Sequence, residues 1–141
     1  MNLIDKRIIS FIKNHHILTL ATINEKGPYC CTCFYVYLEE QNFFIFTSEE
    51  NTKHVKDIRE KNLTAGAIAL ETSMVGKIKG IQFTGITEVL TGNQLVLAKK
   101  IYLKKFPIAR LSNLQLWKME PDFIKMTDNQ FGFGKKLIWY K

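Results

Sequence analysis

The alternation of apolar and polar residues divides this chain into short helical and extended segments. Apolar side chains at helical spacing over residues 3–13 predict an amphipathic helix. Residues 17–23 and 29–38 are rich in β-branched and aromatic side chains and are separated by a polar turn, and residues 43–47 follow a second turn. Because parallel strands need long crossovers, three strands joined this closely predict an antiparallel meander.

The pattern changes after the third strand. Asn51 or Thr52 can serve as the N-cap of a short helix that ends near residue 61. Gly80 and Gly85 interrupt a long extended segment, which indicates a bulge or the close approach of another backbone. The remaining predicted elements are strands over residues 63–70, 77–90, 114–119, 123–127 and 135–140, and a helix over residues 94–106 that Pro107 ends.

These six or seven strands and three short helices contain no internal repeat and no linker, so we expect residues 1–141 to form one domain. Meandering antiparallel strands with peripheral helices favour a closed or partly closed barrel, because closure removes exposed strand edges. The expected fold class is therefore mainly β.

Composition and charge limit where the protein can reside in the cell and what kind of partner it can bind. The chain is 46% hydrophobic and 23% charged, and it holds no apolar run near the roughly 20 residues needed to cross a bilayer. The charged start over residues 1–7 lacks the apolar region of a signal peptide, which predicts a cytoplasmic protein. The net charge of +7 points to nucleic acid, an acidic surface or a phosphorylated small ligand. Scattered lysines without a basic arm or a known motif disfavour nucleic acid.

The cysteines gather in one predicted strand. Cys30 and Cys33 have the spacing of redox and zinc motifs, and Cys31 lies between them. A zinc site needs further ligands, and a reactive thiol needs a neighbour that lowers its pKa. The flanking residues form strands, so adjacent thiols point to opposite faces. This pattern favours a structural role over metal binding or redox use, and no metal is predicted.

Acid–base or hydrolytic chemistry has no recognisable site in the sequence. His15, His16 and His54 show no metal-ligand spacing with a carboxylate, and no nucleophile elbow is present. Chemistry in this chain must therefore come from a bound cofactor, or the protein has none.

The segment from Phe46 to Lys53 has the character of a phosphate site. A strand ends, a polar loop turns, and a helix begins with free N–H groups, which hydroxyls and a lysine can complement. Glu49 and Glu50 fit this function only if they turn outward. Plain helix capping by Asn51 or Thr52, with a solvated lysine, is the alternative, and spacing alone leaves both open.

Three segments carry a resemblance to a known class of proteins: residues 80–85, residues 106–110 and, most specifically, the tail over residues 127–139. Together with the order of helix, three strands, phosphate-type loop and long strand, they resemble the pyridoxamine 5′-phosphate oxidase-like, FMN-binding split-barrel superfamily. They are most similar to its bacterial YhbP-like branch. The resemblance implies a six- to seven-stranded antiparallel split β-barrel, of the flavin-reductase and pyridoxamine-phosphate-oxidase type, that binds FMN across a homodimer interface.

The resemblance also implies site residues. In the oxidases an aromatic–Thr pair ends the third strand, and a Ser-Arg-Lys group opens the next helix. Thr52 and Lys53 carry over as phosphate ligands. Two family arginines are missing, however: Thr52 replaces one, and the position of the other falls near Cys31. A member of the family that binds no flavin is therefore an open alternative. The implied cofactor-binding residues of the loop are Phe46, Thr47, Ser48, Asn51, Thr52 and Lys53.

Further residues are expected near the flavin ring. Gln82 would approach it from the partner subunit, Thr32 and Cys33 would flank it, and Lys136 and Trp139 would reach it from the C-terminal tail. For Gln82 the alternative is an ordinary outward polar residue, and for Trp139 it is the core. The predicted function is an FMN-dependent oxidoreductase acting on a small molecule. A non-catalytic flavin or haem module, a deazaflavin-binding barrel and a basic nucleic-acid-binding protein are the alternatives.

Overall fold

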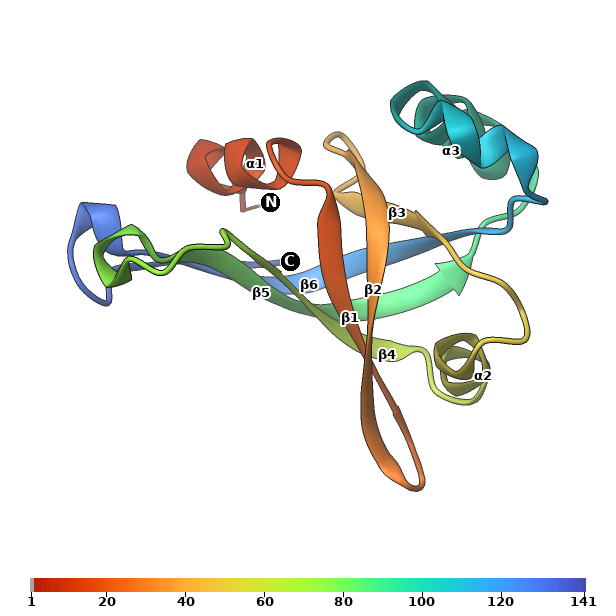
Figure 1. The fold of residues 1–141 in the computed structure, drawn as a ribbon, viewed down its shortest axis with the longest axis horizontal. Helices are drawn as coiled ribbons and strands as arrows, with labels where there is room; N and C mark the ends of the chain where they lie inside the picture. The colour runs from red at the N-terminus through yellow and green to blue at the C-terminus, as the bar shows by residue number, and fades with distance from the viewer. Residues whose placement is uncertain (1) are drawn as a thin grey trace.

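The computed structural model describes residues 2–141, which form seven strands and three α-helices (Figure 1). Short 3₁₀ turns at residues 75–77, 107–111 and 129–131 join some of them. In chain order the elements are α1 (Lys6–Lys13), β1 (Ile17–Asn24), β2 (Gly27–Leu38), β3 (Phe43–Thr47), α2 (Lys53–Glu60), β4 (Leu63–Ala69), β5 (Lys79–Val89), α3 (Gly92–Lys105), β6 (Leu116–Asp128) and β7 (Lys136–Tyr140). None of the helices among residues 2–141 is long and apolar enough to span a bilayer.

The strands form one antiparallel sheet that closes on itself. Its order is β3-β2-β1-β4-β5-β6-β7, and an additional pairing of β3 with β6 closes the first six of these into a barrel. The first part of β6 (Leu116–Met119) pairs with β3, whereas its second part (Phe123–Thr127) pairs with β7. The barrel is therefore split where β6 exchanges one neighbour for another, and the predicted split-barrel fold is confirmed.

One strand prediction was wrong in detail. The sequence pattern separates residues 114–119 from residues 123–127, but the structure runs one strand, β6, through Pro121. Thr84 pairs with Phe123 and Gly85 with Pro121, which leaves Asp122 as the extra residue of a β-bulge. Because the bulge coincides with the exchange of β3 for β7, the missing N–H of Pro121 disrupts no regular ladder there.

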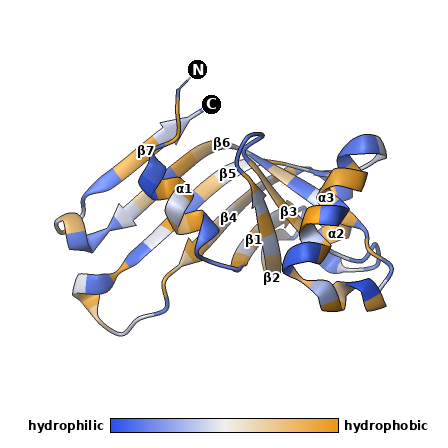
Figure 2. Cartoon of the chain, turned by 90° about the horizontal axis from the view of Figure 1, so that it is seen from above, coloured by the Kyte–Doolittle hydropathy of each residue, from blue (hydrophilic) through white to orange (hydrophobic). Residues whose placement is uncertain are grey.

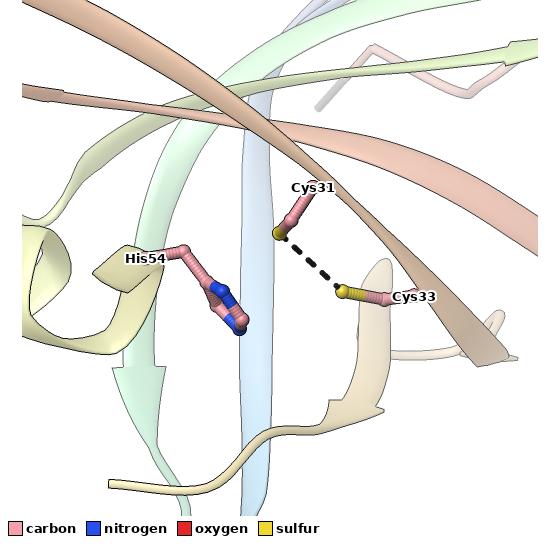
Figure 3. A group of neighbouring side chains, drawn as sticks. All are labelled: Cys31, Cys33 and His54. Carbon is pink, nitrogen blue, oxygen red and sulfur yellow. Dashed lines mark hydrogen bonds between the residues drawn. The ribbon is translucent and has the colours of Figure 1, made fainter. Parts of the chain in front are cut away.

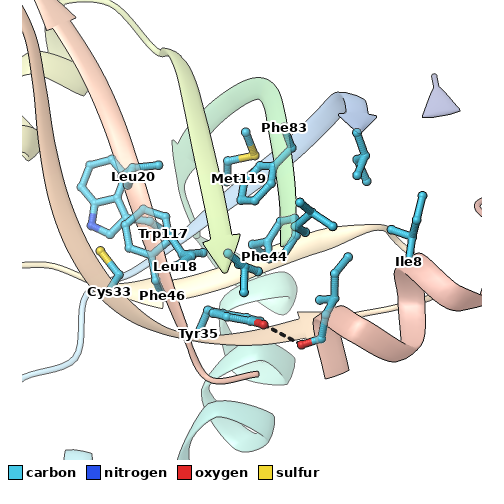
Figure 4. Packing of buried hydrophobic residues seen from close by; sticks show 14 of the residues in the cluster. Ile8, Leu18, Leu20, Cys33, Tyr35, Phe44, Phe46, Phe83, Trp117 and Met119 are labelled. Atoms are coloured by element: carbon cyan, nitrogen blue, oxygen red, sulfur yellow. Dashed lines mark hydrogen bonds between the residues drawn. The ribbon is translucent and has the colours of Figure 1, made fainter. Parts of the chain in front are cut away.

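Two apolar clusters hold the elements together. The barrel interior contains large buried side chains such as Phe44, Phe83 and Trp117, and α1 adds Ile8 and Ile12 to it (Figure 4). Helix α2 contributes Val55 and Ile58 to the same cluster, whereas α3 packs outside the barrel against β2, β3 and β6. The two short helices are thus fixed by burial of one apolar face each.

The helix boundaries follow their capping residues. α1 begins at Lys6, three residues later than the pattern predicts, because the Asp5 carboxylate accepts a hydrogen bond from the backbone N–H of Arg7 (2.8 Å). α2 begins after Thr52 as predicted, and α3 ends before Pro107. The start of α2 matters most for function, because it follows the loop that the sequence marks as a phosphate site.

Candidate cofactor site

The loop between β3 and α2 is fastened to the start of β6. The Thr47 hydroxyl donates a hydrogen bond to the carbonyl of Gln115 (3.0 Å), and the indole N–H of Trp117 donates to the carbonyl of Ser48 (3.2 Å). Phe46 is fully buried, so its side chain belongs to the core and not to the loop surface (Figure 4). Of the aromatic–Thr pair, only the threonine lies at the loop.

The N-terminus of α2 has donor groups that its own N-cap residue leaves free. Thr52 has the extended backbone of an N-cap, but its hydroxyl donates back to the carbonyl of Glu49 (2.8 Å), and within the described chain it makes no capping bond to the helix. Glu50 is turned away, because the guanidinium of Arg59 donates to both of its carboxylate oxygens (2.8 and 3.0 Å). First-turn N–H groups that lack a cap form a site for an anion.

Lys53 is directed away from this helix start. Its ammonium group lies 3.0 Å from Oδ2 of Asp57 and 4.5 Å from the ring centre of Tyr29. Asp57 is buried and also accepts hydrogen bonds from the Thr22 hydroxyl and the Asn24 amide (both 2.8 Å). Asp57 therefore joins α2 to β1, while Lys53 pairs with it inside the helix and lies over Tyr29 of β2, so the lysine charge is not presented to the loop.

Burial and hydrogen bonding shift the pKa of the Asp57 carboxylate in opposite directions. Burial raises the pKa of Asp57, but the hydrogen bonds from Asn24, Thr22 and Lys53 favour the charged form. Together these partners leave its pKa below the ordinary value of 3.8. Asp57 is therefore a charged anchor for the helix at neutral pH.

A cluster of two thiols and an imidazole lies beside the same loop (Figure 3). The Sγ atoms of Cys31 and Cys33 are 3.9 Å apart, and a ligating atom of each cysteine and of His54 lies within 4.8 Å of the others. Nε2 of His54 is 2.7 Å from the Ser48 hydroxyl. We call Cys31, Cys33 and His54 the thiol–histidine cluster.

The two thiols differ in their affinity for a proton. The neighbouring Cys33 thiol and then His54 lower the pKa of Cys31 to about 5 against the opposing effect of burial. The same Cys31–Cys33 hydrogen bond, together with burial, raises the pKa of Cys33. The contact between the two thiols therefore favours a thiolate on Cys31 over one on Cys33.

Where β2, β1, β4 and β5 pair with one another, their outer surface carries no charged residue. The next outward position of β5, Glu88, lies beyond this pairing and is paired with Lys118 of β6. Directly opposed residues share one face of a sheet, and the register places sixteen outward positions of β2, β1, β4 and β5 on the same face. Charged residues make up 23% of the chain, so their absence from these sixteen described positions is a distinct feature. We call this the uncharged face: Pro28, Cys30, Thr32, Phe34, Ile17, Thr19, Ala21, Ile23, Leu63, Ala65, Ala67, Ala69, Gly80, Gln82, Thr84 and Ile86.

Two of the predicted ring-binding residues lie in one row of this face. Thr32 pairs with Thr19, Thr19 with Ala67, and Ala67 with Gln82, so the row spans four strands, about 14 Å. Cys33 points the other way, into the barrel, and only its backbone is near Thr32. The structure thus brings Thr32 and Gln82 to one surface and removes the Cys33 side chain from it.

The remaining predicted residues lie elsewhere within one chain. Asn51 is exposed in the turn before α2, and Lys136 is exposed at the start of β7. Trp139 is buried, with its indole N–H donating to the carbonyl of Asn2 (2.8 Å), and β7 lies at the opposite end of the molecule from α2 (Figure 2). Trp139 also lines a groove of about 1030 Å³ whose described lining residues include none from the β3–α2 loop. The roles proposed for these residues stay predictions.

Sequence reasoning missed the thiol–histidine cluster. The C-x-x-C spacing draws attention to Cys30 and Cys33, but the structure pairs Cys31 with Cys33, because residues two apart share a strand face. That alternation was the available signal for the thiols. His54 lies on a different element, and no local spacing links it to them.

The closed barrel with its split at β6 defines the class of this protein as a split β-barrel of the pyridoxamine 5′-phosphate oxidase-like fold. A comparison with family models found no match. A "UPF0306 protein" of Yersinia pseudotuberculosis is 36% identical over 129 residues, which cover 92% of this chain and 88% of that protein. The chain belongs to the UPF0306 family.

Solved structures share the fold at low sequence identity. A pyridoxamine 5′-phosphate oxidase-related, FMN-binding protein from Nostoc punctiforme matches with a TM-score of 0.75 and 12% identity, over 99% of this chain and 92% of that one. HutZ, a haem storage protein from Vibrio cholerae, matches with a TM-score of 0.68 and 14% identity, over 100% of this chain and 96% of that one. At these identities the likeness concerns the fold alone.

Proposed function

We propose that this protein is a homodimeric FMN-binding oxidoreductase that acts on a small molecule. The observation that carries the proposal is the N-terminus of α2. Its N-cap residue makes no side-chain capping bond to the first-turn N–H groups, and the Ser48 hydroxyl lies beside the first turn. Such a helix start suits the phosphate of a nucleotide cofactor. The same fold in an FMN-binding protein from Nostoc punctiforme supports the choice of cofactor.

The residues divide into two groups in this proposal. Ser48, Thr52 and the first-turn N–H groups of α2 would hold the phosphate, while Thr32 and Gln82 on the uncharged face would contact the ring system. A bound flavin ring would accept and donate the electrons. The protein's own contribution is to position that ring and to exclude water with uncharged side chains.

The uncharged face supports the proposed homodimer. In a chain with a net charge of +7, an outer sheet surface with exposed Ile17, Phe34 and Ile86 needs a cover. A second copy related by a twofold axis would bury the same face on both subunits. This arrangement would also place Gln82 of each subunit at the interface.

A Thr52→Asp variant tests the phosphate site directly. Aspartate is a good N-cap, so α2 stays formed, but its charge occupies the anion site. We expect the wild type to bind FMN about five- to thirtyfold more tightly than riboflavin, because a phosphate at a helix N-terminus is worth about 1–2 kcal/mol. In Thr52→Asp this preference should disappear, whereas Thr52→Ser should keep it. Fluorescence titration of the three proteins with both ligands measures the six dissociation constants.

Equal affinity of the wild type for FMN and riboflavin would overturn the phosphate site. The absorbance of protein purified without added flavin, and the mass of any compound released on denaturation, identify the resident cofactor. A Soret band without a flavin spectrum would assign the barrel to haem instead. Salt-sensitive binding of polyanions without any chromophore would favour the nucleic-acid alternative.

An Ala67→Glu variant tests the homodimer. Ala67 lies in the row between Thr32 and Gln82, so a carboxylate there would be buried twice in a twofold interface. We expect light scattering to show a dimer for the wild type and a monomer for Ala67→Glu, with flavin retention reduced in parallel. Lys99→Glu, a larger charge change at an exposed position of α3, should remain dimeric. A monomeric wild type would refute this interface.

A further inference from the structure

The thiol–histidine cluster has the donor atoms of a site for a thiophilic metal ion. Two thiols and one imidazole face one another from β2 and α2 (Figure 3). Among the residues that the structure describes, no carboxylate joins this group. Sulfur and imidazole donors suit Zn²⁺ and related transition metals, whereas Mg²⁺ and Ca²⁺ require oxygen donors.

The spacing of the donors matches the size of zinc. Two Zn–S bonds of about 2.3 Å at the tetrahedral angle place their sulfur atoms about 3.8 Å apart. The Cys31 and Cys33 sulfur atoms are 3.9 Å apart without any metal to draw them together. The hydrogen bond between Nε2 of His54 and the Ser48 hydroxyl (2.7 Å) holds the imidazole beside them, which is the arrangement that second-sphere partners give to metal-binding histidines.

The position of the cluster also suits an ion that exchanges with solvent. Cys33 is buried and belongs to the core cluster, whereas Cys31 and His54 are half-buried. Two thiolates would neutralise a divalent ion at this depth. Three protein ligands leave a fourth position for water or for a small ligand, as in catalytic zinc sites.

We propose that Cys31, Cys33 and His54 bind one Zn²⁺ ion, or a metal of the same class, with an open fourth coordination position. This inference goes beyond the flavin proposal, which uses neither cysteine side chain. The resemblance places a phosphate-binding arginine of the family near Cys31. A metal ion in this chain would therefore supply positive charge at the place where the arginine is missing.

The test uses the full chain, reduced and freed of metal with a chelator. We expect one Zn²⁺ per chain with a dissociation constant below about 1 μM in competition with a chromophoric chelator. Cobalt(II) should give the near-ultraviolet absorption of a thiolate-to-metal charge transfer. Cys31→Ser and Cys33→Ser should each weaken Zn²⁺ binding by at least about 100-fold, since each removes one of three ligands.

Cys30→Ser is the matched control, because Cys30 lies on the same strand but is exposed on the uncharged face. It should keep the affinity and the cobalt spectrum of the wild type. A measurement on the wild type guards against variants that fail to fold: Zn²⁺ should slow the alkylation of Cys31, the half-buried thiol of the cluster. Binding well below one ion per reduced chain, or alkylation of Cys31 at the same rate with and without Zn²⁺, would overturn the proposal. The Thr52 and riboflavin experiment, carried out on metal-free protein, tests the phosphate site separately from the metal site.

Discussion

A Gly85→Ala variant should lose about 3 kcal/mol or more of its free energy of unfolding, one of the two largest effects we expect in this protein. A Cβ atom at Gly85 would lie 2.0 Å from the backbone carbonyl oxygen of Glu120 and 2.9 Å from Cα of Pro121. These are backbone atoms of the neighbouring strand, so no side-chain rotation relieves the overlap. The bulge around Asp122, or the pairing of β5 with β6, must change instead.

Thermal unfolding followed by circular dichroism measures this effect. For a domain of this size a loss of 3 kcal/mol corresponds to a lowering of Tm by about 10 °C. Gly76→Ala is the matched control, because a Cβ there meets no described atom within 4 Å and its backbone has no positive φ. Its Tm should stay within about 2 °C of the wild type. A Gly85→Ala protein with the same Tm as Gly76→Ala would contradict the close approach of β6 to Gly85.

An Asp57→Ala variant should lose about 2–4 kcal/mol, because it leaves the Thr22 hydroxyl and the Asn24 amide without their acceptor. These hydrogen bonds hold α2 against β1. The variant therefore weakens the attachment of the helix that carries His54 and the free N–H groups. Lys53→Ala is the graded control. Its ammonium is half exposed, so removing it should cost less than about 1 kcal/mol. Urea unfolding at neutral pH separates the two variants, and equal losses would refute the central role of the carboxylate.

The Asp57 contribution should also depend on pH. Its pKa in the folded chain is below the ordinary value of 3.8, so the unfolded chain binds this proton more tightly. The stabilisation is therefore fully present above about pH 5 and is lost as the pH falls through the lowered pKa. The stability difference between wild type and Asp57→Asn should stay constant from pH 7 to about pH 5 and shrink below pH 4. A difference that grew on acidification would show that the pKa of Asp57 is raised instead.

The sequence predicted the extended segments well, because β-branched and aromatic residues alternate with polar ones between clear turns. It failed at Pro121, where local rules favour a break in the strand. The pairing of β6 with β5 keeps the strand continuous there, because the strand passes through a bulge at the place where β6 exchanges β3 for β7. The conformational preference of Pro121 alone does not show with which strands β6 pairs.

The candidate site shows the same division. The N-cap position of Thr52 and the phosphate-like loop were readable locally, since capping depends on a few adjacent residues. The Lys53–Asp57 pair also has a local signal, because the two residues are four apart in one helix. The hydrogen bonds of Asp57 to Thr22 and Asn24 have none, because those residues lie on β1, more than 30 positions away. The hydroxyl of Thr52 likewise bonds to Glu49 and not to the helix.

By itself the sequence determined the strand segments, the start of α2, the end of α3 before Pro107 and the barrel class, all of which rest on periodicity, capping and turn chemistry over short stretches. Only the tertiary structure decided that sixteen uncharged positions share one face, that Cys31 and not Cys30 pairs with Cys33, and that His54 meets them. The physical reason is that strand alternation sets which way a side chain points, while strand register and helix packing set what it meets.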